Sequence, residues 1–422
     1  MEGFIPHTAV LRGFAQHVKR GVKSVSWVQA NIFATAESWF TQQARRVGAA
    51  SDRSPWWLFA YEKQQSFKRW LQDFAKGEHR FSPLREYFFA GESTKVWSYP
   101  DRLMIHLLLK IIRPTFKHVI SKQCFHLSGP SSLRKITALV KAALTTNDYH
   151  YAIRLDIRSY YASIDHEILL KQLKENYDDP KLINYFQQMI TVAVDKNAQL
   201  TLPKKGIPLR SALSPFFGAL YLTPLDRAFE QRKGVLYVRF MDDVLILFKT
   251  KRQLTRARKK IFTILRELKL QISPHKTKMG PLKEGFHFLG VDYCVSQNAQ
   301  NEQVMTTALH ARSCRRALDK VEQMCNGLAV GSTEQGQTVS AGDTNRTRVA
   351  SDTKRLRTYA VHPAHIQRYL VNWAAWWTHV VGVSTLQLLE EWVVFAHKHH
   401  PSFRWLGSGL LLGSGARCRP LA

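Results

Sequence analysis

Three aspartates adjoin short runs of β-forming residues and could bind cations there. Asp242 and Asp243 are adjacent and lie between two apolar runs in VLYVRFMDDVLILFK (residues 235–249), and Asp156 ends the run YAIRLD. Two neighbouring like charges repel each other and need a cation to offset them. Carboxylates without a His or Cys in the group favour Mg²⁺ over Zn²⁺, and two such ions about 4 Å apart can clamp both oxygens of a phosphoryl transfer. The alternative is a set of surface turns without chemistry.

The elements that would position these acids are typical of an α+β core. Residues 151–300 alternate short β runs with helical stretches, which indicates a small sheet packed against helices. Adjacent aspartates between two β runs suit a hairpin turn, and a neighbouring strand that ends in Asp156 would bring the acids together. An aromatic-rich hairpin is expected around residues 91–94, followed by a helix that Pro114 ends.

The composition indicates a polyanionic partner. The 422 residues include 61 Lys and Arg against 32 Asp and Glu, a formal net charge of +29. Nucleic acid is the leading candidate, because neutralising phosphates with Lys and Arg releases counterions; an anionic membrane surface is the second. The hydrophobic fraction of 45% excludes a wholly disordered basic chain.

We expect no signal peptide, no membrane-spanning helix, and no structural zinc site or disulfide framework. The apolar runs fall short of the ~20 residues that a spanning helix needs, and the N-terminal residues have no continuous apolar stretch typical of a signal peptide. The five cysteines are scattered without a CxxC pair, which argues against a zinc ribbon or a disulfide framework. We therefore expect a cytoplasmic protein without a membrane partner.

Several segments resemble the motifs of reverse transcriptases, more closely the bacterial group II intron-like and retron-like branch than the retroviral one. The four main ones, in chain order, are RLDIRSYYASIDH (154–166), KGIPLRSALSPFFGALYLTPLD (205–226), FMDD (240–243) and SPHKTKMGPLKEGFHFLG (273–290). Upstream, YPDR (99–102) and CFHLSGPSSLRKI (124–136) resemble earlier motifs of the family. The resemblance implies a right-hand polymerase with fingers, palm and thumb, which copies RNA into DNA with two Mg²⁺ ions.

The resemblance also assigns roles to individual residues. Asp156, Asp242 and Asp243 would be the catalytic acids and, with the backbone carbonyl of Ile157, the metal ligands. Tyr161 would exclude a ribose 2′-hydroxyl, unless it or Tyr160 simply packs in the core. The nucleotide-binding set comprises Lys95, Arg102, Tyr161, Pro208 and Lys276, in which Lys276 is either a general acid or a solvated cation. The primer grip comprises Phe288, Leu289 and Gly290. The nucleic-acid-binding set comprises Arg134, Lys135, Arg210, Arg312, Arg315, Arg316 and Lys320.

The chain divides into five expected segments. They are a helical basic N-terminal extension (1–80), fingers (81–150), a palm with a small antiparallel sheet (151–300), a helical thumb (301–400) with a flexible insertion (327–354), and a tail (401–422). We expect the thumb to begin with a helix over TTALHARSCRRALDKVEQM (306–324).

One departure from the family leaves the mode of synthesis open. Leu209-Arg210 stands where the family usually has Gln-Gly or a similar small pair, which removes a polar contact to nucleotide or template. RNA-templated synthesis in a bacterial retroelement or phage-defence system is the first hypothesis, with an RNA template, a DNA primer and dNTPs as partners and a dedicated non-coding RNA as a further candidate. Template-independent or self-primed DNA synthesis is the second. A maturase-like RNA-binding protein with dispensable catalysis is the third.

Overall fold

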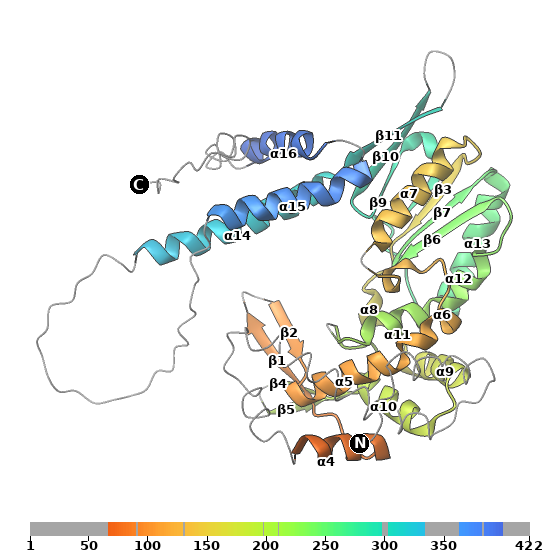
Figure 1. Cartoon of the computed structure of the whole chain (residues 1–422). Coiled ribbons are helices and arrows are strands. Elements are labelled where there is room, and N and C mark those ends of the chain that lie inside the picture. The colour runs from red at the N-terminus through yellow and green to blue at the C-terminus, as the bar shows by residue number, and fades with distance from the viewer. Residues whose placement is uncertain are drawn as a thin grey trace, which may run out of the picture. The chain divides into compact units, whose positions relative to one another are not determined.

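The computed structural model describes residues 66–89, 92–129, 131–196, 198–209, 211–297, 303–333, 363–381 and 384–399 (Figure 1). The chain separates into two compact units. The first comprises Met1–Ile136 and Thr146–Pro281, and the second comprises Thr137–Thr145 and Leu282–Ala422. The predicted extension over 1–80 lies largely outside the described residues, as do the tail over 401–422 and the insertion from residue 334 to 354.

A four-stranded antiparallel sheet forms the centre of the first unit. Its strand order is β6-β7-β3-β8, and its members are β3 (Tyr151–Leu155), β6 (Val235–Phe240), β7 (Asp243–Phe248) and β8 (Lys278–Pro281). Almost every side chain of β3 and β7 is buried, because helices pack on the sheet. Of these, α12 (Thr223–Phe229) contacts β6, whereas α13 (Lys251–Glu267) contacts β3 and β7. This arrangement confirms the predicted mixture of helices with a small antiparallel sheet.

The remaining elements of the first unit are a second sheet, of strand order β2-β1-β4-β5, and several further helices. The predicted hairpin around residues 91–94 is present as β1 and β2, which pair in antiparallel fashion. The second sheet's strands are β1 (Leu84–Phe89), β2 (Glu92–Val96), β4 (Val194–Lys196) and β5 (Gln199–Thr201). The helices are α4 (Ser66–Lys76), α5 (Tyr99–Ile112), η1 (Arg113–Thr115), α6 (Phe116–Val119), η2 (Phe125–Leu127), α8 (Tyr160–Ser163), α9 (His166–Asn176), α10 (Pro180–Ile190) and α11 (Ser214–Tyr221). Helix α7 (Ser132–Thr145) contributes residues to both units.

The second unit combines a three-stranded sheet with three long helices. Its elements are η3 (Leu282–Glu284), β9 (Phe286–Phe288), β10 (Val291–Gln297), β11 (Gln303–Leu309), α14 (Ala311–Thr333), α15 (Pro363–Val381) and α16 (Thr385–His399). The helices contact one another around buried residues such as Leu318, Leu370 and Trp392.

Two boundaries of the predicted thumb were wrong. The helix expected from residue 306 begins at Ala311, because Gln303–Leu309 pairs with β10 as strand β11, where β-branched Val304, Thr306 and Thr307 favour a strand. The insertion expected from residue 327 begins later, since α14 continues to Thr333. Its glycines in this stretch lower helix propensity, but no proline interrupts the backbone hydrogen bonds.

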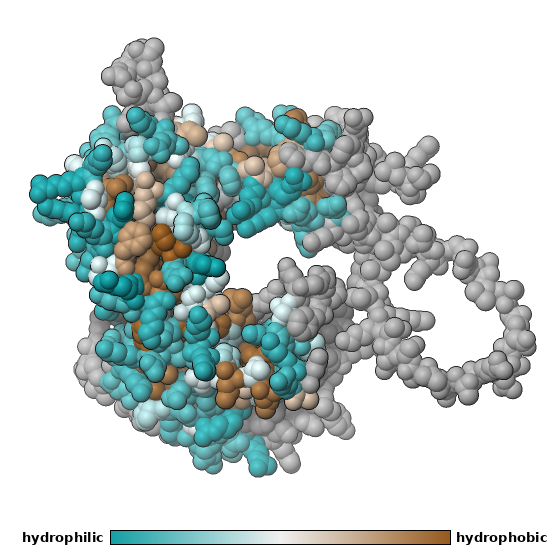
Figure 2. Space-filling model, turned by 180° about the vertical axis from the view of Figure 1, so that it is seen from behind, coloured by the Kyte–Doolittle hydropathy of each residue, from teal (hydrophilic) through white to brown (hydrophobic). Residues whose placement is uncertain are grey.

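Among the described helices, none is long and apolar enough to cross a membrane. The coloured surface in Figure 2 is mostly hydrophilic, with apolar patches between the polar areas.

Candidate active site

The central strand of the first unit leads into the first acid. Strand β3 is buried from Ala152 to Leu155, and half-buried Asp156 follows it directly. The backbone N–H of Asp156 donates to Thr277 Oγ1 over 3.3 Å, and its carbonyl accepts from the Ser273 N–H over 2.8 Å. These bonds fix the backbone of Asp156, directly after the end of the buried strand β3.

The β6–β7 hairpin carries the other two acids. Phe240 pairs with Asp243, which leaves Met241 and Asp242 as a two-residue turn. Met241 has a positive φ of 58°. A tight hairpin turn that follows the twist of its strands needs such a backbone at its first central position. A non-glycine residue in this conformation is costly unless its surroundings hold it there.

The strand register brings the three acids to one end of the sheet. Leu155 pairs with Val244, so Asp156 and Asp243 occupy the next positions along neighbouring strands. Burial, above all, raises the pKa of both Asp242 and Asp243, and the negative charge of Asp156 raises each further. The acids that were predicted to adjoin one another therefore lie at one end of the sheet, with Asp156 opposite Asp243 rather than Asp242, and the mutual repulsion of neighbouring carboxylates favours a cation beside them.

Two cations adjoin the acids. Buried Arg154 donates from Nη2 to Asp243 Oδ1 over 3.2 Å and from Nη1 to the Lys276 carbonyl over 3.0 Å. The charges of Arg154 and Lys276 lower the pKa of Asp243 against the effect of burial, and Lys276 does the same for Asp242. Lys276 itself is exposed.

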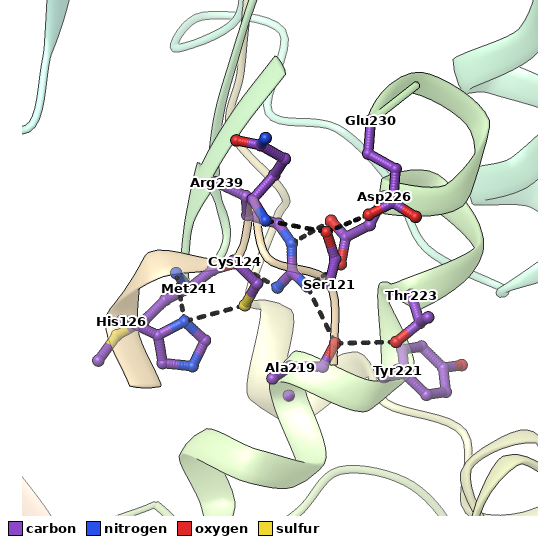
Figure 3. Close-up of polar contacts among 12 residues, drawn as sticks. Ser121, Cys124, His126, Ala219, Tyr221, Thr223, Asp226, Glu230, Arg239 and Met241 are labelled. Carbon is purple, nitrogen blue, oxygen red and sulfur yellow. Dashed lines mark hydrogen bonds and ion pairs between the residues drawn. The ribbon is translucent and has the colours of Figure 1, made fainter. Parts of the chain in front are cut away.

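The turn between Asp242 and β6 is held from both sides (Figure 3). The Met241 N–H donates to His126 Nδ1 over 3.1 Å, and the Met241 carbonyl accepts from Arg239 Nη1 over 3.1 Å. Because Nδ1 accepts, the proton of the neutral ring lies on Nε2, which donates to the Pro215 carbonyl over 3.0 Å. Burial lowers the pKa of His126 to about 4, which keeps the ring neutral. We call His126, Arg239 and its partner Asp226 the turn clamp.

Arg239 reaches the turn from a fully buried position. Neither its side chain nor that of Asp226 is exposed, and Asp226 accepts two charged hydrogen bonds from the guanidinium, from Nε over 2.6 Å and from Nη2. Asp226 also accepts from the Tyr237 hydroxyl over 2.6 Å, and Arg239 Nη2 donates to the Ala219 carbonyl over 3.0 Å. Paired charges of this geometry tolerate burial, and the remaining guanidinium nitrogen is left for Met241.

The donor set at this end of the sheet consists of carboxylate oxygens, which suits a hard divalent cation. Asp156 and Asp242 are the acids without an arginine partner in the hydrogen bonds above. No group of three or more His, Cys, Asp or Glu side chains in the described ranges is arranged as a complete metal site. The carboxylate oxygens of Asp156 and Asp242 fit a hard divalent cation as part of its ligand set.

A scan against protein-family models matches residues 96–293 to the model described as "Reverse transcriptase (RNA-dependent DNA polymerase)". The matched segment contains all three acids, the turn clamp and Arg154. The chain carries a reverse transcriptase domain.

Other comparisons are more distant. Protein YkfC of Escherichia coli (strain K12) is 21% identical over 227 residues, which covers 45% of this chain and 60% of YkfC. Among solved structures, telomerase from Candida albicans in complex with a fragment of telomeric RNA has a TM-score of 0.43 at 10% identity, and covers 82% of this chain and 70% of that one. Apo telomerase from Candida tropicalis has a TM-score of 0.41 at 13% identity, and covers 56% and 52%. The chain thus spans 60% of the length of its curated relative.

Within the reverse transcriptase domain, Tyr161 lies near Asp242, one of the three acids predicted to be catalytic. Burial raises the pKa of Tyr161 to about 12, and the charge of Asp242 contributes to the rise. Tyr160 is instead buried and donates to the Gly218 carbonyl over 2.6 Å. Core packing therefore applies fully to Tyr160 and in part to Tyr161, which is half-buried and packs against the same core near Asp242.

The GIP segment is attached to the turn of helix that carries Tyr161. The Ile207 N–H donates to the Tyr161 carbonyl over 2.9 Å. Gly206 has a φ of +84°, and an added Cβ would lie 2.9 Å from the Ala162 carbonyl oxygen. Pro208, the next predicted residue, is half-buried directly after this contact. Arg210 lies outside the described residues.

The predicted basic residues of the upstream motifs occupy other elements. Lys95 is exposed on β2 opposite Glu86, whose pKa it helps to lower. Arg102 is exposed on α5, and Arg134 and Lys135 are exposed on α7. Their roles in binding nucleotide or template remain predictions.

In the second unit, the predicted primer grip forms the β9–β10 turn. Phe288 is fully buried, whereas Leu289 and Gly290 have φ values of 51° and 83° and link the two strands. An added Cβ at Gly290 would lie 2.7 Å from Ser313 Oγ and 2.9 Å from the Trp377 ring. Close packing thus requires glycine here, and the role of the turn in holding a primer stays a prediction.

The predicted basic face of the thumb lies on the first half of α14. Arg312, Arg315, Arg316 and Lys320 are all exposed, whereas Ala317, Leu318 and Val321 on the same helix are buried. The cations therefore occupy the outer side of an amphipathic helix. Whether they bind nucleic acid is not tested by this arrangement.

Sequence reasoning missed Arg154, His126 and Arg239. A signal existed for the two arginines, since each is a lone cation inside a β run that is otherwise apolar or aromatic. A charge at such a position must be buried with a partner, and each strand ends one or two residues before an acid predicted to be catalytic.

Proposed function

We propose that this protein is an RNA-directed DNA polymerase that adds deoxynucleotides to a primer 3′-hydroxyl. The observation that carries the proposal is the gathering of Asp156, Asp242 and Asp243 at one end of a sheet, within the segment that matches the reverse transcriptase family. On this proposal, residues 81–150 act as fingers, 151–300 as palm and 301–400 as thumb.

Two Mg²⁺ ions are the proposed cofactors. They would supply Lewis acidity for the attacking hydroxyl and the departing pyrophosphate. Asp156 and Asp242 would hold them, with the Ile157 carbonyl as a further ligand. Asp243 would contribute from beside them, positioned by its hydrogen bond to Arg154.

Neighbouring side chains would select and neutralise the nucleotide. Tyr161 adjoins Asp242 and would occupy the space of a ribose 2′-hydroxyl, which favours deoxynucleotides. Lys276 is exposed near Asp242 and Asp243 and would offset or protonate the departing pyrophosphate. Lys95 and Arg102 would meet the triphosphate or the template, and the basic residues of α7 and α14 the nucleic-acid backbone.

A primer-extension assay tests the proposal. The full chain is incubated with oligo-dT-primed poly-rA, labelled dTTP and Mg²⁺. Asp242→Asn is compared with Asp148→Asn, which removes an exposed acid paired with Lys249. Loss of metal-bound charge should cost several kcal/mol of transition-state stabilisation, hence about 10³-fold in rate, whereas the control keeps its activity. Equal incorporation by both variants would contradict the assignment.

Two alternatives remain as outcomes of the same assay. Leu209 is 61% exposed at the departure from the family motif, so nucleotide and template contacts there differ from the usual ones. Incorporation without template or primer would favour template-independent or self-primed synthesis. RNA binding and cellular function that survive Asp242→Asn would favour a maturase-like role with dispensable catalysis.

The biological setting that we propose is a bacterial retroelement or phage-defence system in the cytoplasm. The resemblance to the group II intron-like and retron-like branch supports this setting, as does a cysteine pattern without a disulfide framework. A dedicated non-coding RNA is the candidate partner, and sequencing of RNA that copurifies with the full chain would identify it.

A further inference from the structure

Helix α13 presents an outer face of nearly uniform charge. Its 17 residues include one acid, the terminal Glu267. The seven basic residues, all exposed, are Lys251, Arg252, Arg256, Arg258, Lys259, Lys260 and Arg266. A helix face that only needs to be soluble usually mixes both signs, because Glu–Lys pairs one turn apart stabilise it.

This charge pattern opposes the stability of the helix. Lys251 and Arg252 lie in the first turn, where the helix dipole disfavours cations. Arg252 and Arg256, and Arg256 and Lys260, are like charges four residues apart, which repel. Within the described part of the chain, none of the seven forms an ion pair with a carboxylate.

The fold of α13 does not depend on these cations. Thr250 and Gln253 form a capping box at its start. A buried stripe that includes Ala257, Ile261 and Leu265 packs it on the sheet. The basic face is therefore dispensable for folding and costly in electrostatic terms, so a polyanionic partner is the physical reason to keep it.

The face extends towards the active site along the length of the sheet (Figure 1). Helix α13 begins next to the end of β7 that is remote from Asp243. After the helix, the chain returns to Ile272, which bridges to Ile157 beside the catalytic Asp156. Seventeen residues span about 25 Å. This length is enough to follow several consecutive phosphates along one strand of a duplex.

The side chains on this face suit a duplex backbone better than a single strand. Proteins that hold single strands combine cations with several aromatic stacking platforms. On α13 the exposed large apolar side chain is Phe262, at 42% exposure. Duplex RNA, in contrast, is recognised through its shape and its phosphates. We propose that the outer face of α13 binds the phosphates of a double-stranded segment of the RNA, outside the catalytic group; the choice of RNA rests on the proposed function.

Binding of a labelled RNA hairpin of about 16 base pairs to the full chain tests this proposal, without primer or dNTPs. The test variant is Arg256→Gln/Lys259→Gln/Lys260→Gln, since glutamine keeps the helix propensity. The matched control, Lys171→Gln/Lys174→Gln/Lys76→Gln, removes three exposed lysines that lie on α9 and α4 of the first unit. Thermal unfolding of both variants verifies that they fold.

The expected result is a selective loss in the test variant. Each lost phosphate contact reduces the magnitude of the negative slope of log K against log salt by up to about 0.9, so the loss of three contacts reduces it by up to about 2.7. The affinity near 0.1 M salt should fall at least about tenfold. Equal affinities and slopes in the two variants would overturn the proposal. A loss with a DNA hairpin but not with RNA would overturn the choice of RNA. Since the assay requires no catalysis, a wild-type chain that binds through α13 but incorporates no dNTP would contradict the proposed function alone.

Discussion

Variants of the turn clamp should separate its contribution to stability from its contribution to catalysis. Arg239→Met removes a fully buried guanidinium that pairs with Asp226 and donates to the Met241 carbonyl. Methionine fills a similar volume and leaves the Asp226 carboxylate buried without its counter-ion. Breaking a buried pair on one side costs about 3–5 kcal/mol, which is a large share of the roughly 5–15 kcal/mol that keeps a domain folded. We therefore expect a severe loss of the free energy of unfolding.

A compensated variant should recover stability but not activity. Asp226→Leu/Arg239→Met removes both charges, and Tyr237→Phe removes the hydroxyl that donates to Asp226. Apolar replacement of a buried pair is often neutral or stabilising, so the triple variant should unfold within about 1–2 kcal/mol of the parent. The Met241 carbonyl still lacks its donor in this variant. Of the two side-chain hydrogen bonds at Met241, the one to His126 then remains, and a misplaced catalytic group can cost about 10²-fold in rate.

Urea unfolding and primer extension measure the two effects on the same protein preparations. Urea midpoints report the free energy of unfolding for the parent, Arg239→Met and the triple variant. Extension rates at several Mg²⁺ concentrations report how well the acids are placed. A single variant as stable as the parent would refute the energetic reasoning. A triple variant with full stability and parental activity would show that Arg239 does not position the turn.

Four further predictions concern three neighbouring residues. His126→Ala removes the acceptor of the Met241 N–H and should cost about 1–3 kcal/mol of stability, whereas His126→Gln can still accept. Burial lowers the pKa of His126 from 6.5 to about 4, so the unfolded state binds a proton on this ring first as the pH falls. The parent's free energy of unfolding should therefore decline between pH 6.5 and about 4. If the difference in this free energy between His126→Gln and the parent does not change with pH, His126 is not the cause. Gly206→Ala needs a positive φ and lies 2.9 Å from the Ala162 carbonyl, so urea unfolding should show a loss of about 2 kcal/mol. Tyr161→Ala should raise incorporation of ribonucleotides about tenfold or more in competition assays, and an unchanged ratio would assign Tyr161 to packing.

Local sequence patterns predicted the turn and the strand that carry the acids. They did not predict the side chains that hold the turn, because those side chains come from distant parts of the sequence. The Asp242 turn and the β3 strand before Asp156 were predictable because alternating apolar runs and turn residues act over a few positions. The turn clamp was not, because Arg239 meets Asp226 across 13 residues and Met241 meets His126 across 115. Only the packed arrangement of the motifs joins such distant side chains.

The predicted thumb shows the opposite limit. Residues 306–309 were predicted to begin a helix together with the residues that follow, but Gln303–Leu309 pairs with β10 as a strand. Strand propensity depends on a partner, and a sequence read segment by segment contains no information on which partner is available. The same reasoning explains why the role of Arg154 was missed: its value comes from the neighbouring strand that presents Asp243.

The two buried arginines, Arg154 and Arg239, affect the three acids of the site in different ways. The charge of Arg239 is neutralised by Asp226. Arg239 therefore acts on the site through its hydrogen bond to the Met241 carbonyl, which positions the turn. Arg154 instead meets Asp243 at the rim of the site and offsets part of its charge. Asp156 and Asp242 then carry the charge without an arginine partner. Since a cation is attracted most strongly where negative charge is least compensated, these two acids are where we expect metal ions to bind first, with Asp243 held beside them by Arg154.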